Sequence, residues 1–291
     1  MKVFVMAGAG NQGRLIIPQL KKAGFTVRSA RQAAGNDDEL VRLGVDEILH
    51  GDACDPDFVR RAYDGVDGVY FLTPTAHPRE REMGWLAIQT ARDAGVGHFV
   101  YSSVLHPIAS LMLQHKAKRD IEERLLEANI RFTIVQPADY MMENTIMDAL
   151  SGNMWRQLYN LDRVQAMVAL TDVADAVAKI FIEREKHFGA TYELCAPGNF
   201  SGNDIARIIS EVSGKDIGSE IITPDQYFEI FYGIGEDDKF RYARALIRSV
   251  ALWMGQYDFA GNPNVLGWIL ERPPLTLEAF VRNIVEREAL K

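Results

Sequence analysis

The chain has 291 residues, and its 32 Lys plus Arg against 40 Asp plus Glu give a formal net charge of −8. This acidic balance argues against a nucleic-acid partner and against binding to an anionic membrane surface. The two cysteines, Cys54 and Cys195, form no CxxC pair and supply neither a disulfide framework nor a thiolate zinc site. Because no run of about 18 apolar residues marks a membrane span, we predict a cytoplasmic globular protein without a metal site.

Short β-branched runs alternate with amphipathic stretches through the first half of the chain. Strands are predicted at 2–7, 26–30, 47–50, 68–72, 98–102 and 131–136, and helices near 12–23, 37–43, 56–64, 79–94 and 112–128. Connections of helical length between successive strands indicate parallel pairing. Consecutive apolar residues, as at 69–72, are typical of strands covered by helices on both faces. The predicted fold is α/β, with a doubly wound parallel Rossmann sheet.

The pattern changes after Pro137. A helix is predicted to begin at Thr171 and Asp172, and two or three more helices lie within 224–291. Between them we predict a strand at 190–195 and a helix at 201–213. We expect a dinucleotide-binding domain over 1–155 and a smaller, mostly helical α/β lobe over 156–291, with part of 165–198 returning to the core sheet.

A glycine-rich loop joins the first strand to the first helix. Gly8, Gly10 and Gly13 match the pattern GxGxxG, and Asn11 and Gln12 lie within it. Glycines let backbone N–H groups approach a pyrophosphate, and the N-terminus of the following helix adds about half a positive charge. These five residues are therefore predicted to bind the phosphates of a dinucleotide. The alternative is a turn that serves only the packing of the helix on the sheet.

The end of the second strand bears on the choice of nucleotide. An NAD site usually places an acid about 20 residues after the glycine motif, where it binds the ribose hydroxyls. Here Arg28 and Arg31 stand in that region, and no acid precedes Asp37. Arginine pairs with phosphate through charge-assisted hydrogen bonds, so Arg31, and secondarily Arg28, are candidates for binding a 2′-phosphate. NADP(H) is the preferred cofactor and NAD(H) stays possible, with a solvated arginine as the alternative interpretation.

Further motifs extend over nearly the whole chain. They lie at 7–13, 50–52 with Asp55, 67–74, 100–103, 118–123, 133–137, 142–144, 170–174 and 261–266. Together they resemble the NmrA-like family of atypical short-chain dehydrogenases/reductases. Two positions depart from the family pattern. The first glycine of its GxxGxxG falls on Ala7, and its strand-2 arginine falls on Gln32 rather than on Arg31.

The resemblance assigns roles to residues that follow the later strands. It implies that Asp52 and Ala53 border the adenine of the cofactor. It implies that Thr73 and Pro74 lie beside the cofactor ribose and diphosphate, and that Pro137 begins a segment on the nicotinamide side.

The catalytic pair of the wider superfamily is incomplete in this chain. That pair is Tyr-x-x-x-Lys on the helix after the fifth strand, where i, i+4 spacing puts both side chains on one face and the Tyr acts as a general acid. Lys118 matches the lysine, but Gln114 occupies the tyrosine position, and an amide has no proton to give up at pH 7. Lys118 is therefore predicted to orient the cofactor ribose or to supply a proton itself. The alternative is an exposed helix lysine like Lys116.

Three residues near this edge of the sheet could replace the missing acid. His106 and His115 are of a type that titrates near neutrality, and His115 shares a predicted helix with Lys118. Tyr140 follows the sixth strand, where the resemblance places the nicotinamide. The alternative for each histidine is a structural or solvated side chain, and for Tyr140 it is a packing aromatic.

Two functions fit a cofactor framework that keeps the lysine and lacks the tyrosine. The first is an NAD(P)H-dependent reductase that passes hydride to a small acceptor that needs little acid help, such as an apolar carbonyl or a quinone. The second is a non-catalytic NADP(H) redox sensor that acts through a regulatory protein partner. Ten Met and 10% aromatic residues favour an apolar small molecule over a sugar nucleotide, and Gln114 disfavours a nucleotide-sugar epimerase.

Overall fold

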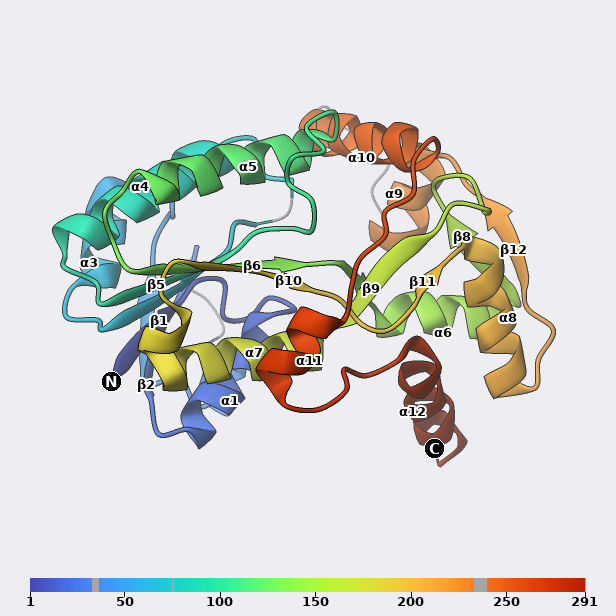
Figure 1. The fold of residues 1–291 in the computed structure, drawn as a ribbon, viewed down its shortest axis with the longest axis horizontal. Coiled ribbons are helices and arrows are strands. Elements are labelled where there is room, and N and C mark those ends of the chain that lie inside the picture. The colour runs from blue at the N-terminus through green and yellow to red at the C-terminus, as the bar shows by residue number, and fades with distance from the viewer. Residues whose placement is uncertain (33–36, 75, 233–239, 291) are drawn as a thin grey trace. The chain divides into compact units, whose positions relative to one another are not determined.

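A computed structural model describes residues 1–32, 37–74, 76–232 and 240–290. Its main feature is a seven-stranded sheet in the order β10-β6-β5-β4-β1-β2-β3 (Figure 1). From β3 to β6 every neighbouring pair of strands is parallel, which confirms the predicted doubly wound Rossmann sheet. The strands are β1 Lys2–Val5, β2 Thr26–Arg31, β3 Glu47–His50, β4 Gly68–Phe71, β5 His98–Ser102, β6 Phe132–Pro137 and β10 Ala190–Leu194.

Helices cover both faces of this sheet (Figure 1). One face carries α3 Pro56–Tyr63, α4 Glu80–Asp93 and α5 Leu113–Leu126, and the other carries α1 Gly13–Lys22 and α7 Leu170–Glu183, which pack against each other. The short helix α2 Asp38–Arg42 precedes β3, and a 3-10 turn, Arg184–His187, follows α7. Because both faces are covered, every residue of β4 and β5 is buried.

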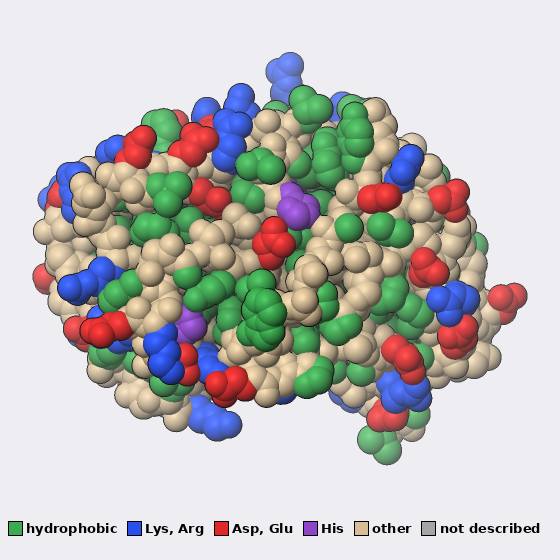
Figure 2. All heavy atoms as spheres, viewed as in Figure 1, with side chains coloured by type: hydrophobic (Ala, Val, Ile, Leu, Met, Phe, Trp, Pro, Cys, Tyr) green, Lys and Arg blue, Asp and Glu red, His purple; other side chains and the backbone are tan. Residues whose placement is uncertain are grey.

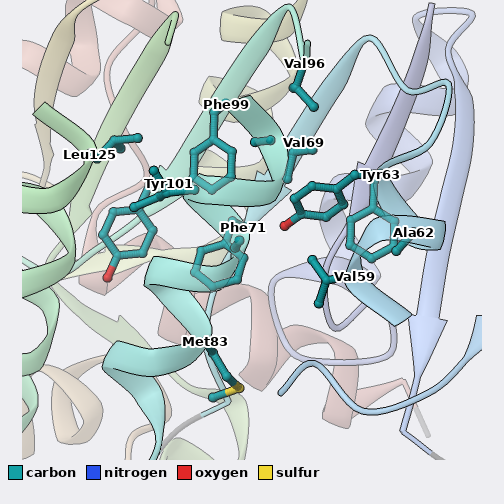
Figure 3. Packing of buried hydrophobic residues seen from close by; sticks show 14 of the residues in the cluster. Val59, Ala62, Tyr63, Val69, Phe71, Met83, Val96, Phe99, Tyr101 and Leu125 are labelled. Atoms are coloured by element: carbon teal, nitrogen blue, oxygen red, sulfur yellow. The ribbon is translucent and has the colours of Figure 1, made fainter. Parts of the chain in front are cut away.

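An aromatic cluster fills the core on the side of α3, α4 and α5. The ring centroids of Phe71 and Phe99 lie 5.7 Å apart, and those of Phe71 and Tyr101 lie 5.9 Å apart (Figure 3). Such pairs contribute about 0.5–1.5 kcal/mol beyond the area that they bury. In Figure 3 the Tyr101 hydroxyl lies at the end of the ring away from Phe99. The cluster holds together β4 and β5, the two strands that lead into the loops described below.

The strand ends show where local geometry overrides the hydrophobic pattern. β3 and β5 have the predicted bounds. β1 ends at Val5 rather than at residue 7, because Ala7 takes a left-handed φ of 53° and its carbonyl accepts the Gly10 N–H at 2.8 Å. β2 continues through Arg31, which pairs in register with His50.

The chain divides into two compact units. The first comprises Met1–Ile108, His115–Pro137 and Leu170–Tyr192, and the second comprises Ala109–Gln114, Ala138–Ala169 and Glu193–Lys291. The second unit contains the sheets β11-β9-β7 and β12-β8, whose short strands the sequence analysis does not predict. Its strands are β7 Asp139–Met141, β8 Met154–Gln157, β9 Gln165–Ala169, β11 Asn199–Phe200 and β12 Gly218–Ile221. Its helices are α6 Glu143–Gly152, α8 Gly202–Ser213, α9 Pro224–Tyr232, α10 Arg241–Met254, α11 Asn264–Leu270 and α12 Leu277–Ala289.

Helix α8 shows how the sequence sets an element of the second unit. Ser201 caps its first turn by accepting the Asp204 N–H, and the Asp204 carboxylate in turn accepts the Ser201 N–H. This capping box satisfies two backbone donors that the helix itself leaves unpaired. The helix then buries Ile205 and Ile209, one turn apart, and ends at Gly214, whose φ is 71°.

Charged side chains of both signs are interspersed over α4 and α5 on the face drawn in Figure 2. Arg81 of α4 pairs with Asp120 of α5 at 3.1 Å. Among the residues that the structure describes, no helix is long and apolar enough to cross a membrane. In the same part of the chain no group of three or more His, Cys, Asp or Glu side chains is arranged to hold a metal ion.

The first residue of β5, His98, is a fully buried histidine. Its Nε2 lies 2.8 Å from Oγ1 of Thr133, and the Thr133 hydroxyl donates its proton to the His187 carbonyl at 2.7 Å. The hydroxyl must therefore accept from His98, which fixes the proton on Nε2. Nδ1 is buried and has no hydrogen-bond partner among the described residues. Burial, with smaller effects of the charges of Arg184 and His187, lowers the pKa of His98 to about 3.

This histidine predicts a loss of stability in mild acid. Its pKa is lower in the folded than in the unfolded chain, so the unfolded chain binds more protons below pH 6.5, and stability falls from there down to the folded pKa of about 3. Between pH 7 and pH 5 we expect His98 alone to cost about 2 kcal/mol of unfolding free energy. Urea denaturation at both pH values measures this loss. The variant His98→Gln should lose about 2 kcal/mol less than the wild type over the same interval, and an equal loss in both proteins would contradict the assignment.

Candidate functional site

The carboxyl ends of the parallel strands gather the predicted cofactor residues of the first unit at one edge of the sheet. The glycine loop follows β1, Arg31 ends β2, Thr73 follows β4, and Pro137 ends β6. Asp52 and Ala53 follow β3, and Pro74 follows Thr73. In the strand order, β1 lies between β2 and β4. The strands β2 and β3 follow on one side of β1, and β4, β5 and β6 follow on the other. Ligands of open α/β sheets bind at the carboxyl edge beside such a switch point.

The loop after β1 depends on the absence of side chains at its glycines. A Cβ on Gly13 would lie 2.6 Å from the Ala7 carbonyl oxygen and 2.6 Å from Cα of Gly8, so α1 begins in direct contact with the loop backbone. At the start of α1 the Gln12 side chain makes no capping hydrogen bond. A narrow backbone cradle at an uncapped helix N-terminus is the environment that a pyrophosphate needs. The loop therefore fits the diphosphate of a dinucleotide.

Gln12 binds inward rather than toward a ligand. Its side chain is buried, and Oε1 accepts hydrogen bonds from the Tyr70 hydroxyl and, at 3.1 Å, from Oγ of Ser102. These donors belong to β4 and β5, so the amide ties the glycine loop to two strands. The Gln12 side chain is thus turned into the protein, whereas the neighbouring Asn11 is exposed.

Ala7 carries the conformation for which glycine is suited. Its φ of 53° lies in the left-handed region, at the position where the NmrA-like pattern has its first glycine. A Cβ in this region costs roughly 1–2 kcal/mol. Ala7 therefore holds this backbone conformation at the cost of local strain.

Two opposite substitutions test the loop. Ala7→Gly should raise the unfolding free energy by about 1 kcal/mol, because it relieves the strain at positive φ. Gly13→Ala should lower it by about 1–3 kcal/mol, because the added methyl meets backbone atoms that cannot move aside. Urea denaturation measures both changes. Gly267→Ala, whose Cβ would lie 3.7 Å from its nearest neighbour, is the control and should not destabilise. A shift of Ala7→Gly in the destabilising direction would contradict the assignment of strain.

The structure separates the two arginines proposed for a 2′-phosphate. Arg28 Nε donates to Glu47 Oε2 at 2.6 Å, and its Nη1 donates to the carbonyls of Asp64 at 2.7 Å and Ala62 at 3.1 Å. Arg28 is thus engaged in joining β2 to β3 and to the end of α3, and we withdraw it as a phosphate ligand. Arg31 is half-buried at the carboxyl end of β2.

Lys118 lies in a polar cluster on the same edge of the sheet. Its Nζ donates to Thr73 Oγ1 at 3.0 Å and forms an ion pair with Glu80 Oε1, also at 3.0 Å. The Thr73 hydroxyl donates to the same Glu80 oxygen, and Nζ lies 5.7 Å from the ring centroid of Tyr101. We call Thr73, Glu80, Tyr101 and Lys118 the lysine cluster. Only 8% of Lys118 is exposed, so it is not the solvated lysine of the alternative interpretation, unlike its exposed neighbour Lys116.

The sequence pattern of the NmrA-like family matches residues 1–259. The chain belongs to the NmrA-like family. This confirms the resemblance that the motifs indicate.

The similar proteins of this NmrA-like chain include both reductases and an assembly factor. An NAD(P)H azoreductase of Xenophilus azovorans is 26% identical over 283 residues, which are 96% of each chain. The photosystem II assembly factor Ycf39 of Synechocystis is 30% identical over 74% of this chain and 69% of that one. A solved structure of a Citrobacter triphenylmethane reductase in complex with NADP(H) shares the fold, with a TM-score of 0.80. Its sequence is 21% identical, and the match covers 98% of this chain and 100% of the reductase.

The other residues predicted to take part in catalysis lie in different settings. His115 of the NmrA-like chain is buried, and its Nδ1 lies 3.0 Å from the His106 carbonyl, an acceptor that fixes the proton on Nδ1. Burial lowers the pKa of His115 to about 4, so the imidazole is neutral near pH 7 and does not suit the role of a general acid. Tyr140 belongs to β7 of the second unit, half-buried and in register with Val168 of β9.

The sequence analysis misses Glu80, although a signal is present. Met83, Gly84 and Ala87 are buried on one face of α4, and Glu80 precedes them by three, four and seven residues. Residues with this spacing share a helix face, so the apolar stripe already indicates that Glu80 is buried. The surrounding charges of Arg79, Arg81 and Glu82 give the segment the appearance of a solvated helix start.

Proposed function

We propose that this NmrA-like protein is an NAD(P)H-dependent reductase that transfers hydride to a small, apolar carbonyl or quinone-like acceptor. The observation that carries the proposal is the buried ammonium of Lys118 at the edge of the sheet that also bears the glycine loop. A buried ion pair adds little to stability, because the loss of hydration of the two charges offsets most of their attraction; a role in binding is therefore a reason for its presence. The azoreductase and the triphenylmethane reductase support the same reaction type, and triphenylmethane is itself an apolar aromatic framework.

The residues of the first unit divide the binding of the cofactor among them. Gly8, Gly10 and Gly13 would hold the diphosphate through backbone N–H groups, with the exposed Asn11 beside it. Asp52 and Ala53 would border the adenine; the Asp52 carboxylate already accepts the Cys54 N–H at 2.8 Å, which orders this turn. Thr73 and Pro74 would line the ribose and diphosphate, and Pro137 would lie on the nicotinamide side. Tyr140, which belongs to the second unit, stays a prediction of the family resemblance for the nicotinamide side. When bound, a reduced nicotinamide supplies the hydride.

Lys118 orients the cofactor rather than replacing the tyrosine as a strong acid. An ammonium has three N–H donors; one of them is donated to Thr73, and the group as a whole forms an ion pair with Glu80. We assign a further donor to a hydroxyl of the nicotinamide ribose. Gln114 stands one helical turn earlier and cannot protonate a product. An acceptor that becomes a stabilised anion on hydride addition, such as a quinone, takes its proton from water and suits this site.

Turnover with a panel of acceptors tests the reductase proposal. We expect NADPH oxidation with 1,4-naphthoquinone and with an azo dye, followed by absorbance at the nicotinamide band. Lys118→Met should lower kcat/KM by about 100-fold, the size of loss expected when a reacting group is misplaced by about 1 Å. Lys116→Met, the same change at an exposed position of α5, should leave it unaltered. Absence of oxidation with every acceptor, in a protein that binds NADPH, would reject the reductase.

NADP(H) is the proposed cofactor, with Arg31 as the ligand of its 2′-phosphate. Arg31→Ala should weaken NADPH binding about 10-fold, as expected when one charge-assisted phosphate contact is lost, and should change NADH binding less than twofold. Titrations followed by nicotinamide fluorescence measure both constants. Lys22→Ala removes one positive charge from an exposed position of α1 and serves as the control. Equal binding of NADH and NADPH by the wild type would remove the role of Arg31.

A second candidate is the redox sensor, in which NADP(H) binds without turnover and a protein partner responds to it. The assembly-factor relative favours this candidate, because its name denotes action on a protein complex. A sensor predicts that Lys118→Met keeps partner binding, while the ratio of NADPH to NADP⁺ alters it. The location of either activity in the cytoplasm stays a prediction of the sequence.

A further inference from the structure

We propose that Glu80 is a positioning residue, which holds the ammonium of Lys118 in place for the cofactor ribose. The inference rests on the proposed role of Lys118 in cofactor binding. Glu80 is 3% exposed, and its Oε1 receives both the Lys118 ammonium at 3.0 Å and the Thr73 hydroxyl. One carboxylate oxygen thus fixes both polar groups that the cofactor is proposed to meet in this part of the site.

The fold brings the two charges together through a close helix contact. A Cβ on Gly84 of α4 would lie 2.5 Å from Ile121 of α5, so the glycine allows the two helices to approach. Glu80 lies one turn before Gly84, and Lys118 lies one turn before Ile121. The ion pair between Glu80 and Lys118 therefore lies beside the point where α4 and α5 come closest at Gly84, and its separation is fixed by the packing of the two helices.

Glu80 is also held through its backbone at the start of α4. It is the first residue of this helix, and its N–H donates to the His77 carbonyl at 3.1 Å. The Lys118 ammonium also donates to the Thr73 hydroxyl and lies 5.7 Å from the centroid of the Tyr101 ring. The ion pair with Glu80 and the hydrogen bond to Thr73 thus hold the ammonium from two sides.

A second carboxylate on the helix of Lys118 provides the comparison. Glu122 follows Lys118 by one turn, but its carboxylate accepts from Gln136 Nε2 at 2.9 and 3.1 Å, whereas the carboxylate that pairs with the ammonium is that of Glu80. Burial raises the pKa of Glu122, whereas the nearby charge of Lys118 lowers it. Glu122→Gln therefore removes a carboxylate near Lys118 without removing its ion pair. His115, the other titratable neighbour on α5, is neutral near pH 7 because burial lowers its pKa to about 4.

A mutant cycle with NADPH binding as its readout tests this inference in the full chain. Glu80→Gln and Lys118→Met should each weaken NADPH binding about 10-fold, the size of one lost charge-assisted contact. The double variant should be no weaker than Lys118→Met alone, because Glu80 acts through Lys118. Glu122→Gln should stay within twofold of the wild type. Glu80→Asp, which keeps the charge and shortens the side chain, should fall between wild type and Glu80→Gln.

The outcomes separate this inference from the proposed function. Unaltered NADPH binding in Glu80→Gln, or a double variant as weak as the product of the two singles, would overturn the role of Glu80. A purely structural ion pair would lower the melting temperature of Glu80→Gln and leave the binding constant of the folded protein unchanged. If Glu80→Gln does not fold, Glu80→Asp and its double variant with Lys118→Met carry the same test. If the wild type binds NADPH in the expected pattern but oxidises it with no acceptor, the reductase fails and the positioning role stands.

Discussion

Parallel pairing is the constraint on which this structure depends. Six successive strands that run in the same direction must be joined by five crossover connections, and their carboxyl ends must meet at one edge. The loops that leave β1, β2, β3 and β4 therefore collect at that edge, although they are separated by many residues in the chain. No single motif creates the candidate site. The site is formed by several short loops together, and each loop is positioned by the strand that precedes it.

The lysine cluster shows how a protein interior accepts a charge. An isolated ammonium away from water costs many kcal/mol, and a partner carboxylate offsets this only with good geometry and further hydrogen bonds. Here the carboxylate lies at a helix N-terminus, a hydroxyl joins the two charges, and an aromatic face lies beside the ammonium. Replacing the pair with apolar side chains would be the simpler route to stability. Its presence at the edge of the sheet therefore agrees with a functional role for Lys118.

Periodicity and spacing predict the first unit well because the hydrophobic pattern within each short segment is enough to specify its strands and helices. β3 and β5 keep their predicted bounds, since a run of apolar residues between polar ones specifies a covered strand. β9, with the sequence Gln-Ala-Met-Val-Ala, has little β-branched character and is a strand because of its pairing with β7. Arg28 is misread for a related reason: its carbonyl partners at the end of α3 lie more than thirty residues away in sequence. The motif spacing locates the glycine loop and Lys118, but only tertiary packing reveals that Glu80 faces Lys118.

The inward-facing amide of Gln12 has a consequence for how a ligand is received. Because Tyr70 and Ser102 both donate to its Oε1, the glycine loop is fastened to the sheet by the fold itself. A dinucleotide bound at this loop, as proposed above, would not have to order it, so less conformational entropy would be lost on binding than at a loop that closes around its ligand. Such a loop would favour association in a single step, with the rate set by diffusion and electrostatic attraction and not by rearrangement of the loop.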